Sequence, residues 1–478
     1  MALDVPVSDE RGSFIVATYH PPSAGLGQPT LTTADCIAQS LAVGPIFCAS
    51  LIGVLVAPAA GVAAPLSMLL AVLGMVAMGW VIALFARRYA GAGSLYLFIQ
   101  QAAGPRIGLF AAGVYYISAL FLGGPTLCII VGMNASALLA TLGIAIPWWL
   151  VALAVAIGVA IVNYVGIQIT TRTQLTLTLV SALPLLITAL VIAATGGDGG
   201  HSAAPFTMAA STPMGLLFGM FFATALFSGI ESSAALGEET VNPHRSIPHA
   251  VIGSILITGA FYLVITYTSA IGFGLDHADA WAADPLPLHT LAARYVGSAM
   301  PFWVDVAIIL DLVAVASAFV ALSSRGFFAL ARDGLLPAAL GRVSRRHKTP
   351  VGGNLGITAF TLAAIAAAAL TNTDPLNALY IGAGAGGLLL QATYVMLVLA
   401  AIRFVRQPGP PWRWPVLLAA LATPVVGIYG ALSSAAGPTL LGVYGAAAGL
   451  VVALVWTGVL VVGYPQRLAQ DAAERSTL

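Results

Sequence analysis

The apolar and polar positions form long uncharged runs separated by short polar segments. The runs without Asp, Glu, Lys or Arg that are long enough for helices are residues 36–86, 107–171, 173–197, 246–275, 349–373, 375–402 and 414–466. A helix needs about 20 apolar residues to cross a bilayer, so the first, second and last runs hold two spans each. Two further segments, 199–230 and 295–324, are apolar enough, although the second contains Asp305 and Asp311. The sequence therefore predicts twelve spans.

These spans are predicted to be helices, because they are continuous runs of Ala, Leu, Val and Ile rather than short alternating segments. The fold class expected is an all-α integral membrane protein. The expected spans are residues 35–58, 62–86, 106–135, 147–168, 173–195, 213–236, 248–272, 299–324, 354–371, 376–402, 414–433 and 438–463.

The composition agrees with a membrane protein and excludes several function classes. Hydrophobic residues make up 59% of the 478 residues and charged residues only 7%, whereas a soluble domain carries about 25% charged residues. The net charge of +1 leaves no basic surface for nucleic acid. All histidines fall in tails, loops or helix ends, so we expect no cofactor, no metal site and no enzyme active site within the spans.

The basic residues predict the orientation. If the N-terminus is inside, all but Arg294 of the 18 Lys and Arg residues lie on the cytoplasmic side. We therefore expect a multi-pass protein of the cell membrane with both termini in the cytoplasm. Residues 1–30 are polar and lack the apolar core of a signal peptide, which predicts a short, mostly disordered tail.

Two of the predicted helices are interrupted. Span 1 contains the pair Gly44 and Pro45, and span 6 contains Gly229 followed by Glu231. If residues 31–200 and 201–405 are inverted repeats, with residues 406–478 holding the last two spans and a tail, these interruptions fall in corresponding first helices. Broken first helices indicate a transporter binding site, because unwound backbone offers N–H and C=O groups to a ligand. The alternative is that each break is a kink that serves only packing.

Three sequence motifs resemble those of the amino acid-polyamine-organocation (APC) transporters. Residues 229–231 with 236–248 (LGEETVNPHRSIP) resemble the span-6 signature. Residues 91–96 (GAGSLY) with 103–105 resemble the loop before span 3, and residues 324–337 resemble the segment after span 8. The motifs occur in the family's order.

The resemblance covers roughly residues 30–405 and implies the leucine-transporter fold, a five-plus-five inverted repeat with two extra helices. It also implies transport of amines or amino acids by alternating access. In that family the substrate's carboxylate usually meets N–H groups of a Gly-x-Gly break in span 1. Here the matching positions are Val43, Gly44 and Pro45. Proline has no N–H, so one donor is missing, which favours an amine without a carboxylate, such as a polyamine or amino alcohol.

The candidate substrate-binding residues come from the two breaks and from neighbouring aromatic positions. They are Val43, Gly44, Pro45, Ile46, Tyr115, Phe121, Phe227, Ser228, Gly229 and Ile230. The aromatic residues among them line or gate a pocket in this hypothesis; the alternative is that they only pack.

The candidate coupling residues are Asp311, Glu231 and Ser181. An acid at the bilayer centre is costly, so Asp311 in span 8 is expected to carry the coupling proton or to attract a cation or ammonium group. A structural carboxylate is the alternative. Glu231 matches an acid of the family, which more often braces the broken segment than contacts the substrate. Ser181 aligns with a lysine whose charge takes the place of a sodium ion in many proton-coupled relatives. Coupling through such a lysine is therefore expected to be absent here.

The Gly-rich run Gly382 to Gly387 is not expected to bind a nucleotide. It lies inside span 10, with no strand before it and no lysine after it, so it predicts close helix packing.

The function expected is a secondary active transporter that imports a small organic amine or amino acid, coupled to protons. A sodium-coupled carrier and an ion-independent amino acid or polyamine exchanger are the alternatives within transport. A transporter-like sensor and a membrane enzyme are disfavoured, because the chain has neither a long extramembrane domain nor an intramembrane histidine. The expected partners are the substrate, the bilayer and the coupling ion.

Overall fold

The structure is a computed structural model that describes residues 5–8, 14–17, 29–42, 44–208, 211–408, 410–433 and 437–463. The helices in chain order are α1 (Thr33–Leu41), α2 (Pro45–Ser50), α3 (Ala57–Ala60), α4 (Ala64–Ala86), α5 (Ser94–Ala103), α6 (Pro105–Leu122), α7 (Gly124–Thr141), α8 (Trp148–Val165), α9 (Ile167–Thr195), α10 (Pro213–Ala225), α11 (Pro243–Phe273), α12 (Ala278–Ala283), α13 (Pro287–Tyr295), α14 (Met300–Arg332), α15 (Val351–Leu370), α16 (Pro375–Val405), α17 (Arg413–Ser433) and α18 (Pro438–Gly463). Short π or 3₁₀ segments are η1 (Ile52–Val56), η2 (Gly61–Ala63), η3 (Ala204–Phe206), η5 (Ile230–Leu236) and η6 (Ala338–Gly341).

The predicted all-helical membrane fold is confirmed. The described residues contain 11 helical segments that are long and apolar enough to cross a membrane. The one predicted span that is not counted separately is span 1, residues 35–58. It is divided into α1, α2, η1 and α3. The division follows from the Gly-Pro pair, since proline removes a helical hydrogen bond and glycine tolerates the turn that results.

One short sheet lies in the N-terminal tail. Strands β1 (Val5–Ser8) and β2 (Phe14–Ala17) pair antiparallel, with Val5 opposite Ala17 and Ser8 opposite Phe14. The sequence predicted a mostly disordered segment here. Both strands contain β-branched valine or isoleucine, which favours extended backbone.

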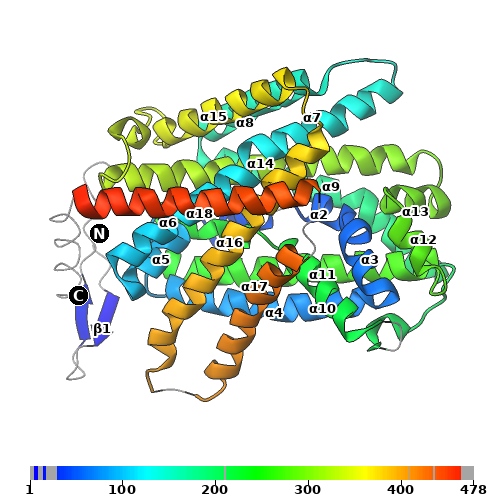
Figure 1. Cartoon of the computed structure of the whole chain (residues 1–478), viewed down its shortest axis with the longest axis horizontal. Helices are drawn as coiled ribbons and strands as arrows, with labels where there is room; N and C mark the ends of the chain where they lie inside the picture. Colours follow the sequence, from blue (N-terminus) through cyan, green and yellow to red (C-terminus); the bar gives the residue numbers. More distant parts are fainter. Residues whose placement is uncertain are drawn as a thin grey trace.

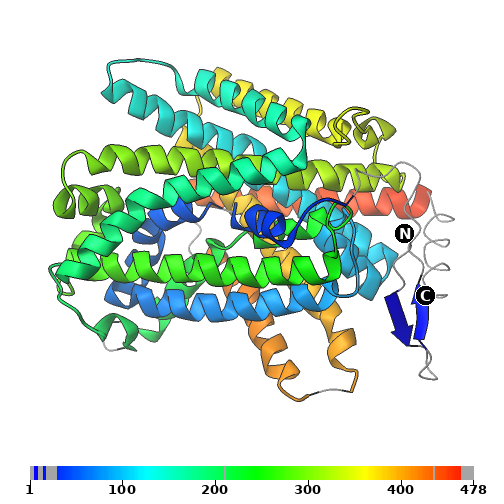
Figure 2. The same cartoon turned by 180° about the vertical axis from the view of Figure 1, so that it is seen from behind.

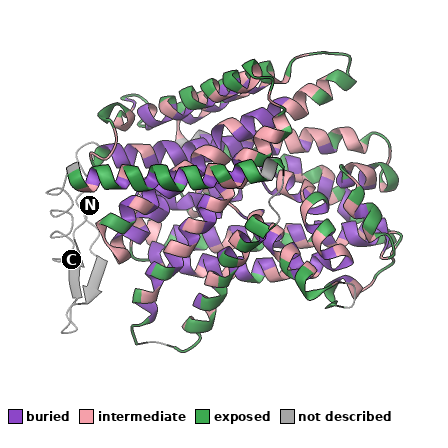
Figure 3. Ribbon diagram, in the orientation of Figure 1, coloured by how far each residue is buried: buried purple, intermediate pink, exposed green. Residues whose placement is uncertain are grey.

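Helices α4, α11, α14 and α18 run along the long axis of the molecule, whereas α9, α16 and α17 cross it obliquely (Figures 1 and 2). Helix α14 lies in the middle of this bundle and contacts α2, α6, α7, α8, α9, α13 and α15. In its most apolar window 78% of the residues are buried, compared with 22% for α8. The exposed residues gather on outer helices such as α15 and α18 (Figure 3), where apolar side chains are suited to contact lipid.

The predicted close packing of the Gly-rich run on α16 is confirmed for two of its glycines. A Cβ at Gly382 would collide with Oγ1 of Thr126, and a Cβ at Gly386 would lie 2.5 Å from Cγ of Leu122. Both neighbours belong to the span-3 helices, so α16 approaches them closely only because these positions lack side chains.

A third interruption divides span 3, where the sequence predicted one continuous helix over residues 106–135. Helix α6 ends at Leu122 and α7 begins at Gly124, while Gly123 has φ −87° and ψ −98°. Pro125 lies in the first turn of α7 and removes one helical donor, which accounts for the break. A Cβ at Gly123 would lie 2.7 Å from Cβ of Phe319 on α14.

Candidate functional site

The break in span 1 is a left-handed glycine followed by a proline. Gly44 has φ +83° and caps α2, whose first residue is Pro45. A Cβ at Gly44 would lie 2.5 Å from Cγ2 of Val315, so both the backbone angle and the approach of α14 require glycine. Pro45 has no N–H, and the carbonyl of Leu41 therefore has no helical donor four residues on. Val43 lies outside the described residues.

Asp311 projects from α14 onto the start of α2. Its Oδ2 accepts hydrogen bonds from the backbone N–H groups of Ile46 at 3.0 Å and Phe47 at 2.9 Å. The residue is 0% exposed. Its second oxygen, Oδ1, has no hydrogen-bond partner among the described residues. One oxygen of this carboxylate thus caps a broken helix, and the other is free to accept.

The break in span 6 begins where α10 ends at Ala225. Gly229 has φ +99° and is followed by the 3₁₀ segment η5. The hydroxyl of Ser228 donates to the carbonyl of Ala225 at 2.8 Å, and the N–H of Ser232 donates to the carbonyl of Gly229 at 2.9 Å. These local bonds satisfy part of the unwound backbone.

Glu231, just after this break, is held by two tyrosines from distant helices. The Tyr115 hydroxyl on α6 donates to Oε1 at 3.2 Å, and the Tyr394 hydroxyl on α16 donates to Oε2 at 2.6 Å. All three side chains are buried. Both carboxylate oxygens therefore have partners, and the group ties η5 to two other helices.

The two breaks are joined to each other through polar residues that the sequence analysis did not single out. The Ser232 hydroxyl donates to the carbonyl of Gln39 at 2.9 Å, and Nε2 of Gln39 donates to the carbonyl of Ala318 at 3.1 Å. Glutamine within an apolar span was a usable signal for this position, because its amide must find partners in lipid-depth sequence.

Tyr262 on α11 makes a second link between the breaks. Its hydroxyl donates to the carbonyl of Leu226 at 3.0 Å, and its ring packs edge to face on Phe227. It also lies close enough to Cys48 on α2 and to Asp311 to interact with both. No pattern in the sequence distinguishes this tyrosine from the other aromatic residues of the spans.

The structure brings most, but not all, of the predicted site residues together. Gly44, Pro45 and Ile46 lie beside Asp311, and Phe227, Ser228, Gly229 and Ile230 form the span-6 break. Tyr115 reaches the span-6 break through its hydrogen bond to Glu231. Two predicted residues lie elsewhere: Phe121 packs against a cluster that contains Val114, Leu389 and Ala446, and the Ser181 hydroxyl donates to the carbonyls of Leu177 and Thr178 on its own helix.

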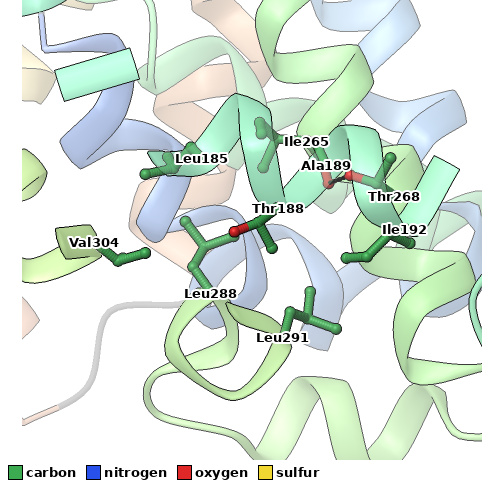
Figure 4. Close-up of a pocket in the computed structure, with 9 residues that line it drawn as sticks. All are labelled: Leu185, Thr188, Ala189, Ile192, Ile265, Thr268, Leu288, Leu291 and Val304. Atoms are coloured by element: carbon green, nitrogen blue, oxygen red, sulfur yellow. Dashed lines mark hydrogen bonds between the residues drawn. The ribbon is translucent and has the colours of Figure 1, made fainter. Parts of the chain in front are cut away.

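The space between the breaks is closed. A pocket lined by Ala42, Gly229, Ser232, Ala318, Phe319 and Leu322 has no room for a water molecule, so a ligand enters only if side chains move. A separate apolar pocket between α9, α11, α13 and α14 has room for about one water (Figure 4). Its lining contains none of the break residues.

The motif residues at one end of the bundle form an ion-pair cluster that is buried at Arg325 and Glu239 and exposed at Arg332. Nη2 of Arg325 donates to Oε1 of Glu239 at 3.2 Å, and its Nε donates to Oε2. Arg332 donates to both oxygens of Glu238, which also accepts the N–H of Ala92. The three motifs thus meet in space.

A smaller polar cluster lies near the opposite end, between α9 and α13. Arg294 pairs with Asp198 at 3.0 Å, and the Tyr295 hydroxyl donates to the same carboxylate at 2.8 Å. Partial burial, followed by the hydrogen bond to Asp198, raises the pKa of Tyr295. Both ends of the bundle therefore have polar contacts between helices.

The chain is similar to known transporters. An uncharacterised transporter of Mycobacterium tuberculosis is 30% identical over 76% of this chain and 78% of its own length. The branched-chain amino acid permease BcaP of Bacillus subtilis is 28% identical over 42% of this chain and 41% of its length. The low-affinity putrescine importer PlaP of Escherichia coli is 24% identical over 58% and 62%.

The solved structure of a Na⁺-coupled sialic acid symporter in a substrate-bound, outward-open state matches with a TM-score of 0.55 at 14% identity, covering 90% of both chains. This likeness shows the leucine-transporter fold. The family model described as amino acid permease matches residues 30–466. The chain therefore belongs to the amino acid permease family of the APC superfamily.

Proposed function

We propose that this protein is a secondary active transporter that imports a small organic amine or amino acid through the cell membrane by alternating access, with protons as the coupling ion. The named relatives include a branched-chain amino acid permease and a putrescine importer, so both substrate classes are represented. In this proposal both termini lie in the cytoplasm, because the basic residues then lie almost entirely on the inner side.

The proposed substrate site lies between the two breaks, at residues 43–46 and 227–230. These breaks occupy corresponding places in the proposed repeats, residues 31–200 and 201–405. The observation that carries the proposal is the half-satisfied carboxylate of Asp311, buried beside Gly44. An ionisable group at membrane depth with an unpartnered oxygen is suited to take a proton or a cationic group. Glu231 braces the span-6 break in this scheme.

Sodium coupling is the second candidate. The solved symporter that shares the fold is described as Na⁺-coupled, and a sodium-driven or ion-independent exchange mechanism would use the same breaks. A transporter-like sensor is a third candidate, but it would bind ligand without moving it.

Transport by purified protein in proteoliposomes tests these alternatives. We expect labelled putrescine or leucine to accumulate when the outside is acidic, and a protonophore to abolish that accumulation. Counterflow of internal for external substrate should persist without any gradient. Accumulation driven only by sodium would favour the second candidate. Absence of uptake and counterflow for a panel of amines and amino acids would reject the transporter proposal.

A further inference from the structure

The donors at the start of α2 are already used by the protein. Pro45 has no N–H, and the N–H groups of Ile46 and Phe47 both donate to Oδ2 of Asp311. The next N–H, that of Cys48, donates to the carbonyl of Gly44 at 2.8 Å. A ligand carboxylate that approached this break would find no free donor in the first turn of α2. It would also be repelled by the charge of Asp311, and the low dielectric of the interior strengthens that repulsion.

The other oxygen of the same carboxylate lacks what a buried anion requires. Oδ1 of Asp311 is without a hydrogen bond among the described residues, although the residue is 0% exposed. The two N–H donors on Oδ2 stabilise the ionised carboxylate, whereas its complete burial opposes ionisation unless a cation lies beside it. The only basic side chain buried on the same helix, Arg325, is paired with Glu239. A buried negative charge with one open oxygen is stabilised by a cationic donor.

On its own helix, Asp311 has apolar neighbours, which suit an organic ammonium better than a metal ion. The residues one turn away on α14 are Ala307, Ile308, Ala314 and Val315, none of which has a side-chain oxygen. A bare metal cation needs several oxygen ligands in place of water. An ammonium group has three donors and an attached carbon chain, which apolar side chains such as those of Ala314 and Val315 can accommodate.

Pro45 removes one donor from the break. Because it cannot donate, the carbonyl of Leu41, the last residue of α1, lacks the hydrogen bond that a continuous helix would give it.

From these observations we propose that the substrate is an amine without a carboxylate, and that its ammonium group binds Oδ1 of Asp311. The carboxylate of Asp311 fills the donor pair that a substrate carboxylate would otherwise occupy. This inference rests on the proposed transport function and names its substrate class.

Matched ligand pairs test the substrate class. The full-length protein in lipid nanodiscs would be titrated with putrescine and ornithine, cadaverine and lysine, and agmatine and arginine, each pair sharing one side chain. We expect the amine to bind at least about tenfold more tightly than its amino acid in one or more pairs. Equal binding, or tighter binding of the amino acid in every pair that binds, would overturn the proposal.

Two substitutions test the role of Asp311. Asp311→Asn should weaken amine binding by at least about tenfold, because the charge is lost. Asp305→Asn, on the same helix but paired with His289 near its exposed end, is the matched control and should bind as the wild type does. Unchanged amine affinity in Asp311→Asn would overturn the assignment, whether or not gradient-driven accumulation is lost.

The reciprocal variant gives a result that a misfolded protein cannot mimic. Asp311→Ala frees the N–H groups of Ile46 and Phe47, so the carboxylate of an amino acid can now occupy them. We expect the preference within each pair to shift toward the amino acid, or acetate to restore amine binding. Tighter amine binding in Asp311→Ala than in the wild type would contradict the proposal.

Two further measurements distinguish sodium binding at Oδ1 from amine binding, and failure of this inference from failure of the transporter proposal. The melting temperature of the wild type would be measured in NaCl and in choline chloride. If NaCl alone raises it, and if Asp311→Asn loses this effect but still binds amines, Oδ1 binds sodium and not the substrate. If amino acids exchange in counterflow but amines do not, the transporter proposal stands and this inference fails. If neither class exchanges, the transporter proposal itself fails.

Discussion

A buried carboxylate lies beside the unwound backbone of each of the two broken helices, but the two carboxylates are satisfied differently. At the span-6 break, both oxygens of Glu231 accept hydrogen bonds from tyrosine hydroxyls. At the span-1 break, Asp311 uses one oxygen for two backbone N–H groups and leaves the other without a partner. A fully bonded buried group holds structure in place, whereas a half-bonded one has capacity for a ligand.

The origin of the two carboxylates adds to this difference. Glu231 belongs to the interrupted segment itself and is fixed by α6 and α16, so the span-6 break is tied to two other helices. Asp311 comes from α14 and caps α2 from outside. A ligand that draws on Asp311 therefore acts directly on the contact between α14 and the start of α2.

The largest effect is expected where both breaks depend on glycine. Gly44→Leu and Gly229→Leu should each lower transport by more than about 100-fold, because a bulky side chain at positive φ strains the backbone and fills the closed space between the breaks. Membrane insertion should be nearly intact, because leucine raises hydrophobicity. Uptake in proteoliposomes and the amount of protein in membranes provide the measurements.

Gly253→Leu is the matched control for these two variants. Gly253 also lies inside a span, but a Cβ there would have nothing within 4 Å. Transport by this variant should stay within about twofold of the wild type, because a substitution away from packed features costs little. Retained transport in both break variants would remove the binding site from this location.

Removing Glu231 should produce a different kind of loss. Glu231→Ala leaves the hydroxyl of Tyr394 buried without its acceptor, at a cost of about 1–3 kcal/mol, whereas the hydroxyl of Tyr115 keeps Oγ of Ser94 as a partner at 3.3 Å. Thermal stability should fall, and the maximal rate should drop equally for every substrate. Tyr394→Phe should cost less, and adding it to Glu231→Ala should cost less than the sum, because the two groups share one bond.

The comparison between the two carboxylates fails if Glu231→Ala changes the affinity for amines and leaves the stability unchanged. A selective loss of amine binding, with the melting temperature unchanged, would give Glu231 the ligand role and leave Asp311 as the brace. The measurement is a titration of each variant with putrescine, alongside its thermal unfolding curve.

The positions of the breaks could be predicted from the sequence because glycine and proline act locally. Gly44 with Pro45, and Gly229, interrupt helices in apolar runs that otherwise continue. The break at Gly123 was missed, although it contains the same residue types, because the surrounding run was read as one span. The helix ends followed less closely from the uncharged runs. Helix α14 continues to Arg332, eight residues beyond the predicted end at 324, and α9 begins at Ile167, six residues before the predicted start at 173, because a helix can extend past the apolar segment that spans the membrane.

The different states of the two carboxylates could not be predicted, because their partners are distant in the sequence. Tyr394 is 163 residues from Glu231, and Ile46 is 265 residues from Asp311. The direction in which the Phe121 side chain points could not be predicted either. A helix that is apolar on all sides has no polar face to show which way a side chain points, and Phe121 turns toward α16 and α18.

The smallest effect is expected at Ser181, the third residue considered for coupling. Its hydroxyl donates to the carbonyls of Leu177 and Thr178, which belong to its own helix. Ser181→Ala therefore removes a donor without leaving a distant partner unpaired, and transport driven by a pH gradient should stay within about twofold of the wild type. Thr178→Val, one turn away, is the control for changing a buried hydroxyl in the same helix. If Ser181→Ala abolishes accumulation while counterflow continues and Thr178→Val behaves normally, coupling depends on α9, and the difference between Asp311 and Glu231 does not explain it.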